Sequence, residues 1–357
     1  MTQQDKFRID SHKLIYHIPR VHDWLKGENI YPVYMEIGLF SGCNHRCVFC
    51  AFDYLRYSPK GLEQKELKKF IRDAAAKGVK SVMYAGEGEP FLHDGAADII
   101  VFTKKSGLDT AVTTNGVMFH RETAVKTLGH LSWLRVSLDA GNAKTYSLIH
   151  KANKSDFRIV INNLEQAINI RDRRRYGCSI GAQFLLIPQN YNDAVSSARL
   201  LRDMGVDYMI VKPYSRHPMS GHKGCRGFED RELLSLEEKL SKYSKRDFQI
   251  IFRRRAMERS DRQKPYKRCL GLPFVTYISA EGDIYPCSRF LGDKRFILGN
   301  ILVDSFHGIW EGRRRKKVMR LFGAKWDIKS CRLNCRLDEI NQYLWELKNP
   351  PAHVNFI

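Results

Sequence analysis

Residues 43–50 read Cys43-Asn44-His45-Arg46-Cys47-Val48-Phe49-Cys50, three cysteines in eight residues directly after the apolar stretch 33–40. Three thiolates at this spacing can hold three corners of a cubane iron–sulfur cluster. A structural metal site fills all four ligand positions, whereas a reactive site keeps one open. The missing fourth cysteine therefore predicts an iron that is free to bind a second molecule. Two alternatives stay open: a structural zinc site completed by His45, or isolated thiols.

Short β-rich runs alternate with amphipathic segments after residue 33, which predicts parallel βα units. The runs predict strands at 33–39, 81–85, 109–114, 134–138, 180–186 and 208–212. The amphipathic segments predict helices at 62–77, 95–106, 121–129, 155–172 and 191–204. Six βα units are too few for a closed eight-stranded barrel. The expected fold class is therefore α/β, with an open, partial (β/α)6 TIM-like barrel.

The alternation stops after residue 212, and the rest of the chain predicts a different organisation. We expect an N-terminal lead-in at 1–32, the core at 33–230, a connecting helical segment at 231–264 and a small α+β domain at 265–357. In the last domain, 274–279 and 284–287 predict a β-hairpin, followed by helices at 306–321 and 336–348. The loop 214–230 is expected to cover the mouth of an active site.

A second group of cysteines lies in the C-terminal part of the chain. Its members are Cys269, Cys287, Cys331 and Cys335. In a reducing compartment, clustered cysteines indicate metal binding or catalysis and not disulfides. Four thiolates suit either a tetrahedral zinc site or a cubane cluster, and the spacing does not exclude zinc.

The spacing of the first group, with Phe49 before its third cysteine, resembles the signature of the radical S-adenosylmethionine (radical SAM) superfamily. The resemblance implies that SAM chelates the open iron of a 4Fe-4S cluster and yields a 5′-deoxyadenosyl radical that abstracts hydrogen. With that motif upstream, the four C-terminal cysteines resemble the SPASM and twitch modules. Their number matches the twitch form, which implies one auxiliary 4Fe-4S cluster. The spacing of Cys269 and Cys287 is similar to that of an aminocyclitol dehydrogenase.

The resemblance also implies which residues bind SAM. The run Gly86-Glu87-Gly88-Glu89-Pro90 is similar to the family's Gly-Gly-Glu-Pro motif, whose backbone and glutamate hold the methionine amine. Glu87 departs from that pattern, and we expect Glu89 to be the carboxylate that acts. Polar residues at the next strand ends look like the family's SAM contacts, with Ser137 and Asp139 expected at the ribose and carboxylate. These strand-end residues are Asn115, Ser137 and Asp139.

The chain of 357 residues has 60 Lys+Arg against 39 Asp+Glu, a formal net charge of +21, which attracts anions. An auxiliary cluster beside a radical site suits the two-electron oxidation of an alcohol carbon. The expected substrate is an anionic small molecule: a sugar, aminocyclitol, sugar phosphate or nucleotide sugar. Lys212, Tyr214 and His217 are the candidate catalytic bases, and Arg216, His217 and Arg255 the candidate phosphate contacts.

Other functions remain open. The first alternative is a peptide- or protein-modifying enzyme of the SPASM class, although a lead-in of 32 residues leaves no room for that class's peptide-binding domain. A ring rearrangement of a nucleotide is a further alternative, and a zinc-bearing, basic nucleic-acid-binding protein is the last. The chain shows no secretory signal or membrane span, so we expect a cytoplasmic protein. The radical SAM resemblance implies a flavodoxin- or ferredoxin-like electron donor.

Overall fold

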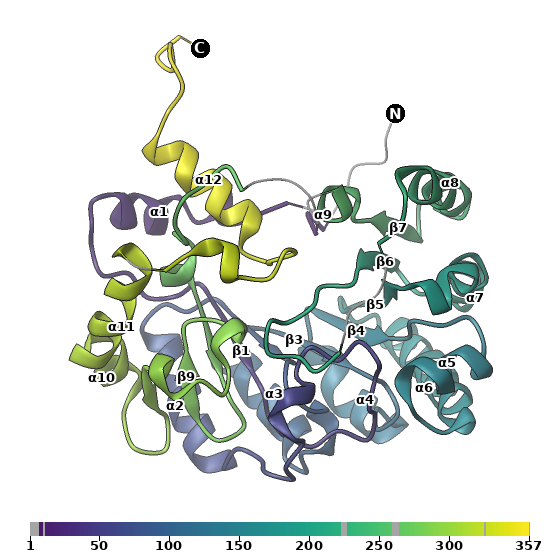
Figure 1. Ribbon diagram of the computed structural model, residues 1–357. Helices are drawn as coiled ribbons and strands as arrows, with labels where there is room; N and C mark the ends of the chain where they lie inside the picture. The colour runs from purple at the N-terminus through teal and green to yellow at the C-terminus, as the bar shows by residue number, and fades with distance from the viewer. Residues whose placement is uncertain (1–6, 10, 223–226, 259–263, 325, 357) are drawn as a thin grey trace.

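The computed structural model describes residues 7–9, 11–222, 227–258, 264–324 and 326–356. A curved sheet with strand order β10-β9-β8-β1-β2-β3-β4-β5-β6-β7 forms its centre (Figure 1). The strands are β1 (Tyr34–Ile37), β2 (Ser81–Tyr84), β3 (Asp109–Thr114), β4 (Trp133–Ser137), β5 (Ser179–Leu186), β6 (Tyr208–Pro213), β7 (Gln249–Phe252), β8 (Val275–Ile278), β9 (Asp283–Tyr285) and β10 (Gly299–Asn300). Strands β1 to β8 pair in parallel, and β8, β9 and β10 pair antiparallel.

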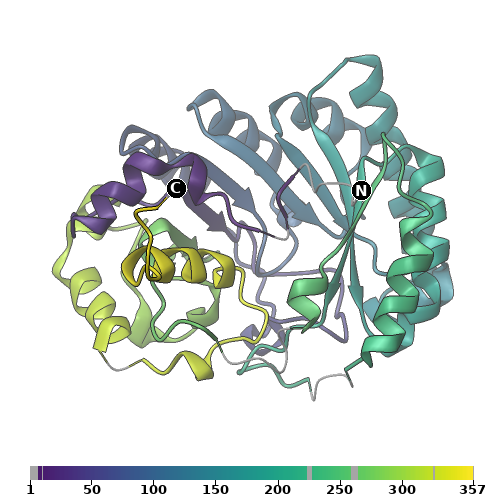
Figure 2. The same ribbon diagram turned by 90° about the horizontal axis from the view of Figure 1, so that it is seen from above.

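Helices cover the outside of the curved sheet, and the C-terminal segment lies across its open side (Figures 1 and 2). The helices are α1 (Ile18–Leu25), α2 (Gln64–Ala76), α3 (Ala96–Lys105), α4 (Arg121–Thr127), α5 (Ala143–His150), α6 (Lys154–Arg173), α7 (Ala194–Met204), α8 (Asp230–Ser241), α9 (Arg254–Glu258), α10 (Phe306–Glu311), α11 (Arg313–Ala324) and α12 (Asp338–Lys348). In α2, Leu67, Phe70, Ile71 and Ala74 are buried, the spacing of one helical face. Within the described ranges, no helix has the length and hydropathy that crossing a lipid bilayer requires.

The six predicted parallel strands are confirmed, and they stand side by side in chain order as β1 to β6. The structure adds two parallel neighbours that the sequence pattern did not predict. Strand β7 lies within the segment 231–264, where we expected only helix, and it pairs with β6. Strand β8, the first strand of the predicted hairpin, pairs with β1. The α/β partial barrel is therefore confirmed as an open sheet that the C-terminal part extends at the β1 side.

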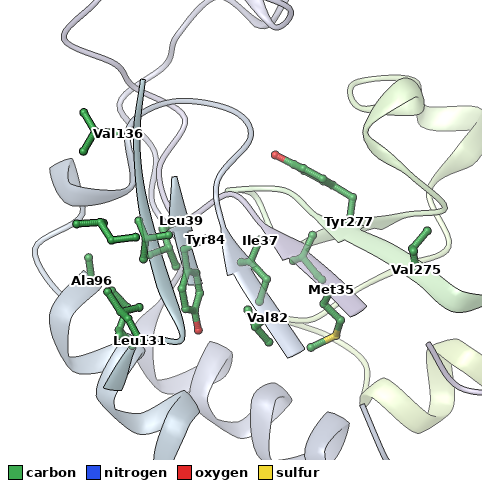
Figure 3. Close-up of a cluster of buried hydrophobic side chains, with 14 of the residues drawn as sticks. Met35, Ile37, Leu39, Val82, Tyr84, Ala96, Leu131, Val136, Val275 and Tyr277 are labelled. Atoms are coloured by element: carbon green, nitrogen blue, oxygen red, sulfur yellow. The ribbon is translucent and has the colours of Figure 1, made fainter. Parts of the chain in front are cut away.

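Alternation along the strands separates an apolar outer layer from the inner surface of the barrel. Met35 and Ile37 of β1 lie opposite Val82 and Tyr84 of β2, and all four are fully buried in one apolar layer (Figure 3). Successive side chains of a strand point to opposite faces of the sheet. Glu36, between Met35 and Ile37, therefore faces the inside of the barrel, where it lines a cavity.

Candidate active site

The loop with the first three cysteines follows the carboxyl end of β1, and all three thiols are partly buried. The Cys47 Sγ atom lies 3.1 Å from His150 Nδ1, and Asn115 Nδ2 lies 4.0 Å from Cys43 Sγ. Burial raises the pKa of the Cys43 thiol to about 12, and the Glu89 carboxylate adds to this effect. Metal binding would deprotonate such thiols, because a bound cation replaces the proton.

His45, which lies in the same loop, is buried. Its Nε2 atom lies 3.3 Å from the Asp156 carboxylate, and its side chain is 1 % exposed. Among the described residues, the candidate metal ligands that gather within 4.8 Å of one another are His45, Cys47 and His150. This group leaves out Cys43 and Cys50. The structure therefore does not bring together a zinc site made of His45 and all three loop cysteines.

The glycine-rich turn after β2 packs its backbone directly against its neighbours. Gly86 and Gly88 have φ values of 108° and 68°, a region that favours glycine. A Cβ atom at Gly88 would overlap the Phe40 carbonyl oxygen, and one at Gly86 would overlap the Tyr277 hydroxyl. Both glycines are therefore required, one against the segment before the cysteine loop and one against β8.

Glu89 joins this turn to the end of β3. Its carboxylate accepts hydrogen bonds from the Thr114 hydroxyl at 2.6 Å, the Asn115 N–H at 2.8 Å and the Phe91 N–H at 3.2 Å. The Asn115 side chain then donates to Asn44 Oδ1 in the cysteine loop at 2.6 Å. Glu89 thus positions the turn, β3 and the cysteine loop together. Its contact with the SAM amine stays a prediction.

Glu87, which departs from the family pattern, has a different set of contacts. Its carboxylate accepts from the Ala280 N–H, and its own N–H donates to the Tyr277 hydroxyl at 3.0 Å. Desolvation raises the pKa of Glu87 to about 7. Since Tyr277 lies on β8 and Ala280 in the turn after it, Glu87 fastens the glycine turn to the C-terminal hairpin.

The four C-terminal cysteines are gathered beside helix α12. Three N–H groups point at their sulfurs: Trp326 Nε1 at 3.3 Å from Cys331 Sγ, Asn341 Nδ2 at 3.5 Å from Cys269 Sγ, and Leu337 N at 3.4 Å from Cys335 Sγ. No three of these sulfurs lie within 4.8 Å of one another. A tetrahedral zinc with Zn–S bonds of about 2.3 Å requires sulfurs about 3.8 Å apart. The wider spacing fits a cubane cluster better than zinc, and the N–H groups can donate to thiolates that hold such a cluster.

A cavity of about 510 Å³ lies inside the curved sheet and extends to all four C-terminal cysteines. Phe49 and Phe52 of the first cysteine loop contribute to its wall, as does Gly86. Basic side chains dominate its charged lining, which comprises Glu36, Arg135, Lys212, Arg253, Arg289, Arg332 and Arg336. Glu36 forms an ion pair with Arg336. The cavity thus offers a mainly positive surface beside the C-terminal cysteines, which attracts anions.

Comparison with known families agrees with this geometry. Residues 37–201 match the sequence profile of the radical SAM superfamily, and residues 245–336 match an iron-sulfur cluster-binding domain called SPASM. The chain belongs to the radical SAM superfamily. The radical SAM domain implies a 4Fe-4S cluster and SAM, and the SPASM domain implies an auxiliary iron–sulfur centre. The two groups of partly buried cysteines described above fit these two iron–sulfur centres.

Individual relatives cover different parts of this radical SAM chain. An S-adenosylmethionine-dependent nucleotide dehydratase from Lacinutrix mariniflava is 30% identical over 158 residues, 38% of this chain but only 33% of that protein. The antilisterial bacteriocin subtilosin biosynthesis protein AlbA from Bacillus subtilis is 25% identical over 340 residues, 89% of this chain and 70% of its own length. Streptococcus suis SuiB bound to S-adenosylmethionine superposes with a TM-score of 0.68 at 19% identity, over 94% of this chain and 79% of SuiB. At 19% identity, the similarity to SuiB shows a shared fold.

Among the predicted catalytic bases of this radical SAM chain, Lys212 lines the cavity. It lies on β6, one strand from Gln183, which also lines the cavity. Burial lowers the pKa of Lys212 to about 7, and the charges of Arg135 and Arg253 lower it further, whereas Asp139 acts in the opposite direction. About half of such a lysine is neutral near pH 7 and able to accept a proton.

Tyr214 and His217 are not part of the cavity lining. Tyr214 packs against the hydrophobic core. His217 Nδ1 accepts from the Met219 N–H at 3.1 Å, which leaves Nε2–H to donate to the Arg289 carbonyl at 3.2 Å. Burial lowers the pKa of His217 to about 3. His217 thus has both ring nitrogens engaged in holding the loop, and its role as a base stays a prediction.

The strand-end residues predicted to contact SAM occupy different surroundings. Asp139 is fully buried, has a φ of 55°, and its carboxylate accepts from the Leu185 N–H. Burial raises the pKa of Asp139 to about 7. Ser137 is half-buried at the end of β4, and Pro90 begins a short 3-10 helix after Glu89. Asp139 and Ser137 lie outside the cavity lining, so their contacts with the ribose stay predictions.

Proposed function

We propose that this radical SAM chain oxidises an alcohol carbon of an anionic small molecule to a carbonyl, within the cavity of about 510 Å³. The observation that carries the proposal is Lys212, a lysine whose pKa burial lowers to about 7, on the wall of a cavity that reaches the C-terminal cysteines. Small-molecule sites have volumes of about 300–1,000 Å³, so this cavity is in the range for a compact substrate.

The cofactors and the chain divide the chemistry between them. When bound, the first cluster with SAM supplies a 5′-deoxyadenosyl radical, and the auxiliary cluster supplies an electron acceptor. The alcohol loses one hydrogen atom from carbon, which yields 5′-deoxyadenosine, together with one electron and the hydroxyl proton. Lys212 accepts that proton. The first electron that cleaves SAM comes from a flavodoxin- or ferredoxin-like donor.

The basic side chains of the cavity support an anionic substrate. Arg135 lies over the Trp133 ring at 4.5 Å, and its buried Nε atom has no hydrogen-bond partner among the described residues. Arg253 lines the same cavity, whereas Arg216 and Arg255, the arginines expected to contact phosphate, are exposed and outside the lining. An arginine with an unused donor in a buried wall suits a carboxylate or phosphate group. We therefore assign the anionic end of the substrate, a sugar phosphate or nucleotide sugar, to Arg135 and Arg253.

The second candidate function is modification of a peptide or protein. It is favoured by AlbA, a bacteriocin biosynthesis protein whose similarity extends over 89% of this chain. Another structure of SuiB is described as bound to its precursor peptide SuiA, and it superposes with a TM-score of 0.66 at 18% identity. In this case the cavity would take one side chain of the peptide instead of a free small molecule.

Anaerobic turnover of the reconstituted enzyme separates the two candidates. One panel contains hexose phosphates, aminocyclitols and nucleotide sugars, and the other contains peptides with serine or threonine. The proposal expects a rise in 5′-deoxyadenosine with a member of the first panel, and a product lighter by two hydrogens. A substrate with deuterium on the alcohol carbon should transfer it to 5′-deoxyadenosine. A response only to peptides would reject the small-molecule proposal and support the second candidate.

A further inference from the structure

Arg332 lies between the two groups of cysteines. In the chain it directly follows Cys331, one of the four C-terminal cysteines. In space its guanidinium carbon lies 5.5 Å from the centre of the Phe52 ring, two residues after Cys50 of the first group. Arg332 also lines the cavity, which the four C-terminal cysteines border and to which Phe49 and Phe52 of the first cysteine loop contribute. One side chain therefore reaches from the C-terminal site to the radical SAM loop.

The guanidinium group of Arg332 has unused donors in a buried place. Its Nε and Nη2 atoms are shielded from solvent and have no hydrogen-bond partner among the described residues. A buried cation without acceptors is costly. The side chain is therefore built to face negative charge at this position.

The neighbouring arginines have protein partners of their own. Arg336 pairs with the Glu36 carboxylate and donates to the Tyr34 hydroxyl at 2.8 Å. Arg289 donates from Nε and Nη2 to the Ser330 carbonyl at 3.3 and 3.4 Å. Among these three arginines, Arg332 is thus the one whose buried Nε and Nη2 atoms have no hydrogen-bond partner within the described part of the chain.

We propose that Arg332 raises the reduction potential of the auxiliary cluster, and more weakly that of the radical SAM cluster, by placing a fixed positive charge between them. A reduced cluster carries one more negative charge than an oxidised one, so a nearby cation stabilises the reduced state. The effect is larger at the C-terminal site because Arg332 directly follows Cys331 in the chain, whereas it meets the first cysteine loop only at the Phe52 ring. A higher auxiliary potential favours transfer of an electron from the substrate to that cluster.

The proposal is tested on the reconstituted holoenzyme, without SAM or substrate, by redox titration followed by electron paramagnetic resonance. Arg332→Met removes the charge, and Arg332→Lys keeps it. Arg253→Met is the matched control, because it removes one positive charge from the same cavity. We expect Arg332→Met to lower the equilibrium constant for reducing the auxiliary cluster at least tenfold, about 59 mV for one electron. Arg332→Lys should retain most of the wild-type potential.

Three outcomes would overturn the inference. The first is an auxiliary potential in Arg332→Met equal to that of the wild type. The second is an equal shift of the auxiliary potential in Arg253→Met, which would mean that the effect does not depend on where in the cavity the positive charge lies. The third is loss of product formation in Arg332→Met with both potentials unchanged, which would make Arg332 a substrate contact. If Arg332→Met does not retain its iron, Arg332→Gln replaces it with the same expected direction. The test requires the clusters alone, so it stands even if no alcohol is oxidised.

Discussion

Lys212 should destabilise the folded protein, and removing its charge should therefore stabilise it. The side chain lines the cavity, and burial lowers its pKa from 10.5 to about 7. Lys212→Met keeps an unbranched side chain of similar length without the ammonium group. An ordinary core substitution would lower stability. The opposite result is expected here because the wild-type residue holds a cation away from water.

The size and pH dependence of the effect follow from the shift. One pKa unit corresponds to about 1.4 kcal/mol, so the full shift has an upper limit of about 5 kcal/mol. Structural relaxation and water reduce such penalties, and we expect about 1–3 kcal/mol. Below pH 7 the lysine is charged in both states and the penalty is complete. Between pH 7 and 10.5 the unfolded chain binds a proton that the folded chain does not, so the penalty fades as pH rises.

Thermal unfolding of the reconstituted protein under anaerobic conditions provides the measurement. The apparent Tm of Lys212→Met should exceed that of the wild type by a few degrees at pH of about 6–7, and the difference should vanish near pH of about 10. Lys144→Met is the control, because Lys144 is exposed. A Lys212→Met variant that is less stable than the wild type at low pH would refute the reasoning. A difference that does not change with pH would refute it as well.

Further substitutions test the two metal sites and the glycine turn. Cys43→Ala should reduce 5′-deoxyadenosine formation to the level without enzyme, while the C-terminal iron remains. Cys287→Ala should remove about four irons per chain and stop product formation while SAM cleavage without product continues; full turnover would argue against an electron acceptor there. Gly88→Ala should cost about 1–3 kcal/mol and impair SAM cleavage, because its Cβ would overlap the Phe40 carbonyl oxygen. Gly177→Ala, with no atom within 4 Å of the added Cβ, should leave both unchanged.

Local patterns predicted the core of the fold but not its edges. The β-rich runs of β1 to β5 are each followed by a helical pattern, and this alternation is a strong local signal. Strand β7 consists of the four residues Gln249–Phe252, and the helix that follows it, α9, has only five residues, so neither gives a strong sequence pattern. The hairpin of β8 and β9 was predicted, but its pairing with β1 was not. That pairing joins segments far apart in the chain, which no local pattern encodes.

The cysteine motifs could be found from sequence because their spacing is itself the chemical requirement. The cations of the cavity carry no such spacing. The inward position of Arg135 could have been predicted from the sequence, because it stands between the apolar residues Leu134 and Val136 on β4. Its side chain must point to the other face of the sheet from theirs. Arg332 was not, because its position depends on how the C-terminal segment crosses the open side of the barrel (Figure 2). His217 could be singled out from the sequence, but the sequence does not show that both of its ring nitrogens already form hydrogen bonds.

Glu87 stands where the family's Gly-Gly-Glu-Pro motif has no such residue, and its contacts give a structural reason for this difference. A glycine at this position would leave the Ala280 N–H without the carboxylate that now accepts from it. The same residue donates its own N–H to Tyr277 on β8, the strand that pairs with β1. The glycine turn beside the cysteine loop is therefore tied by two hydrogen bonds to the hairpin from which Cys287 follows. Glu87 thus adds two hydrogen bonds to the β1–β8 pairing, which already places the hairpin that leads to Cys287 beside the first cysteine loop.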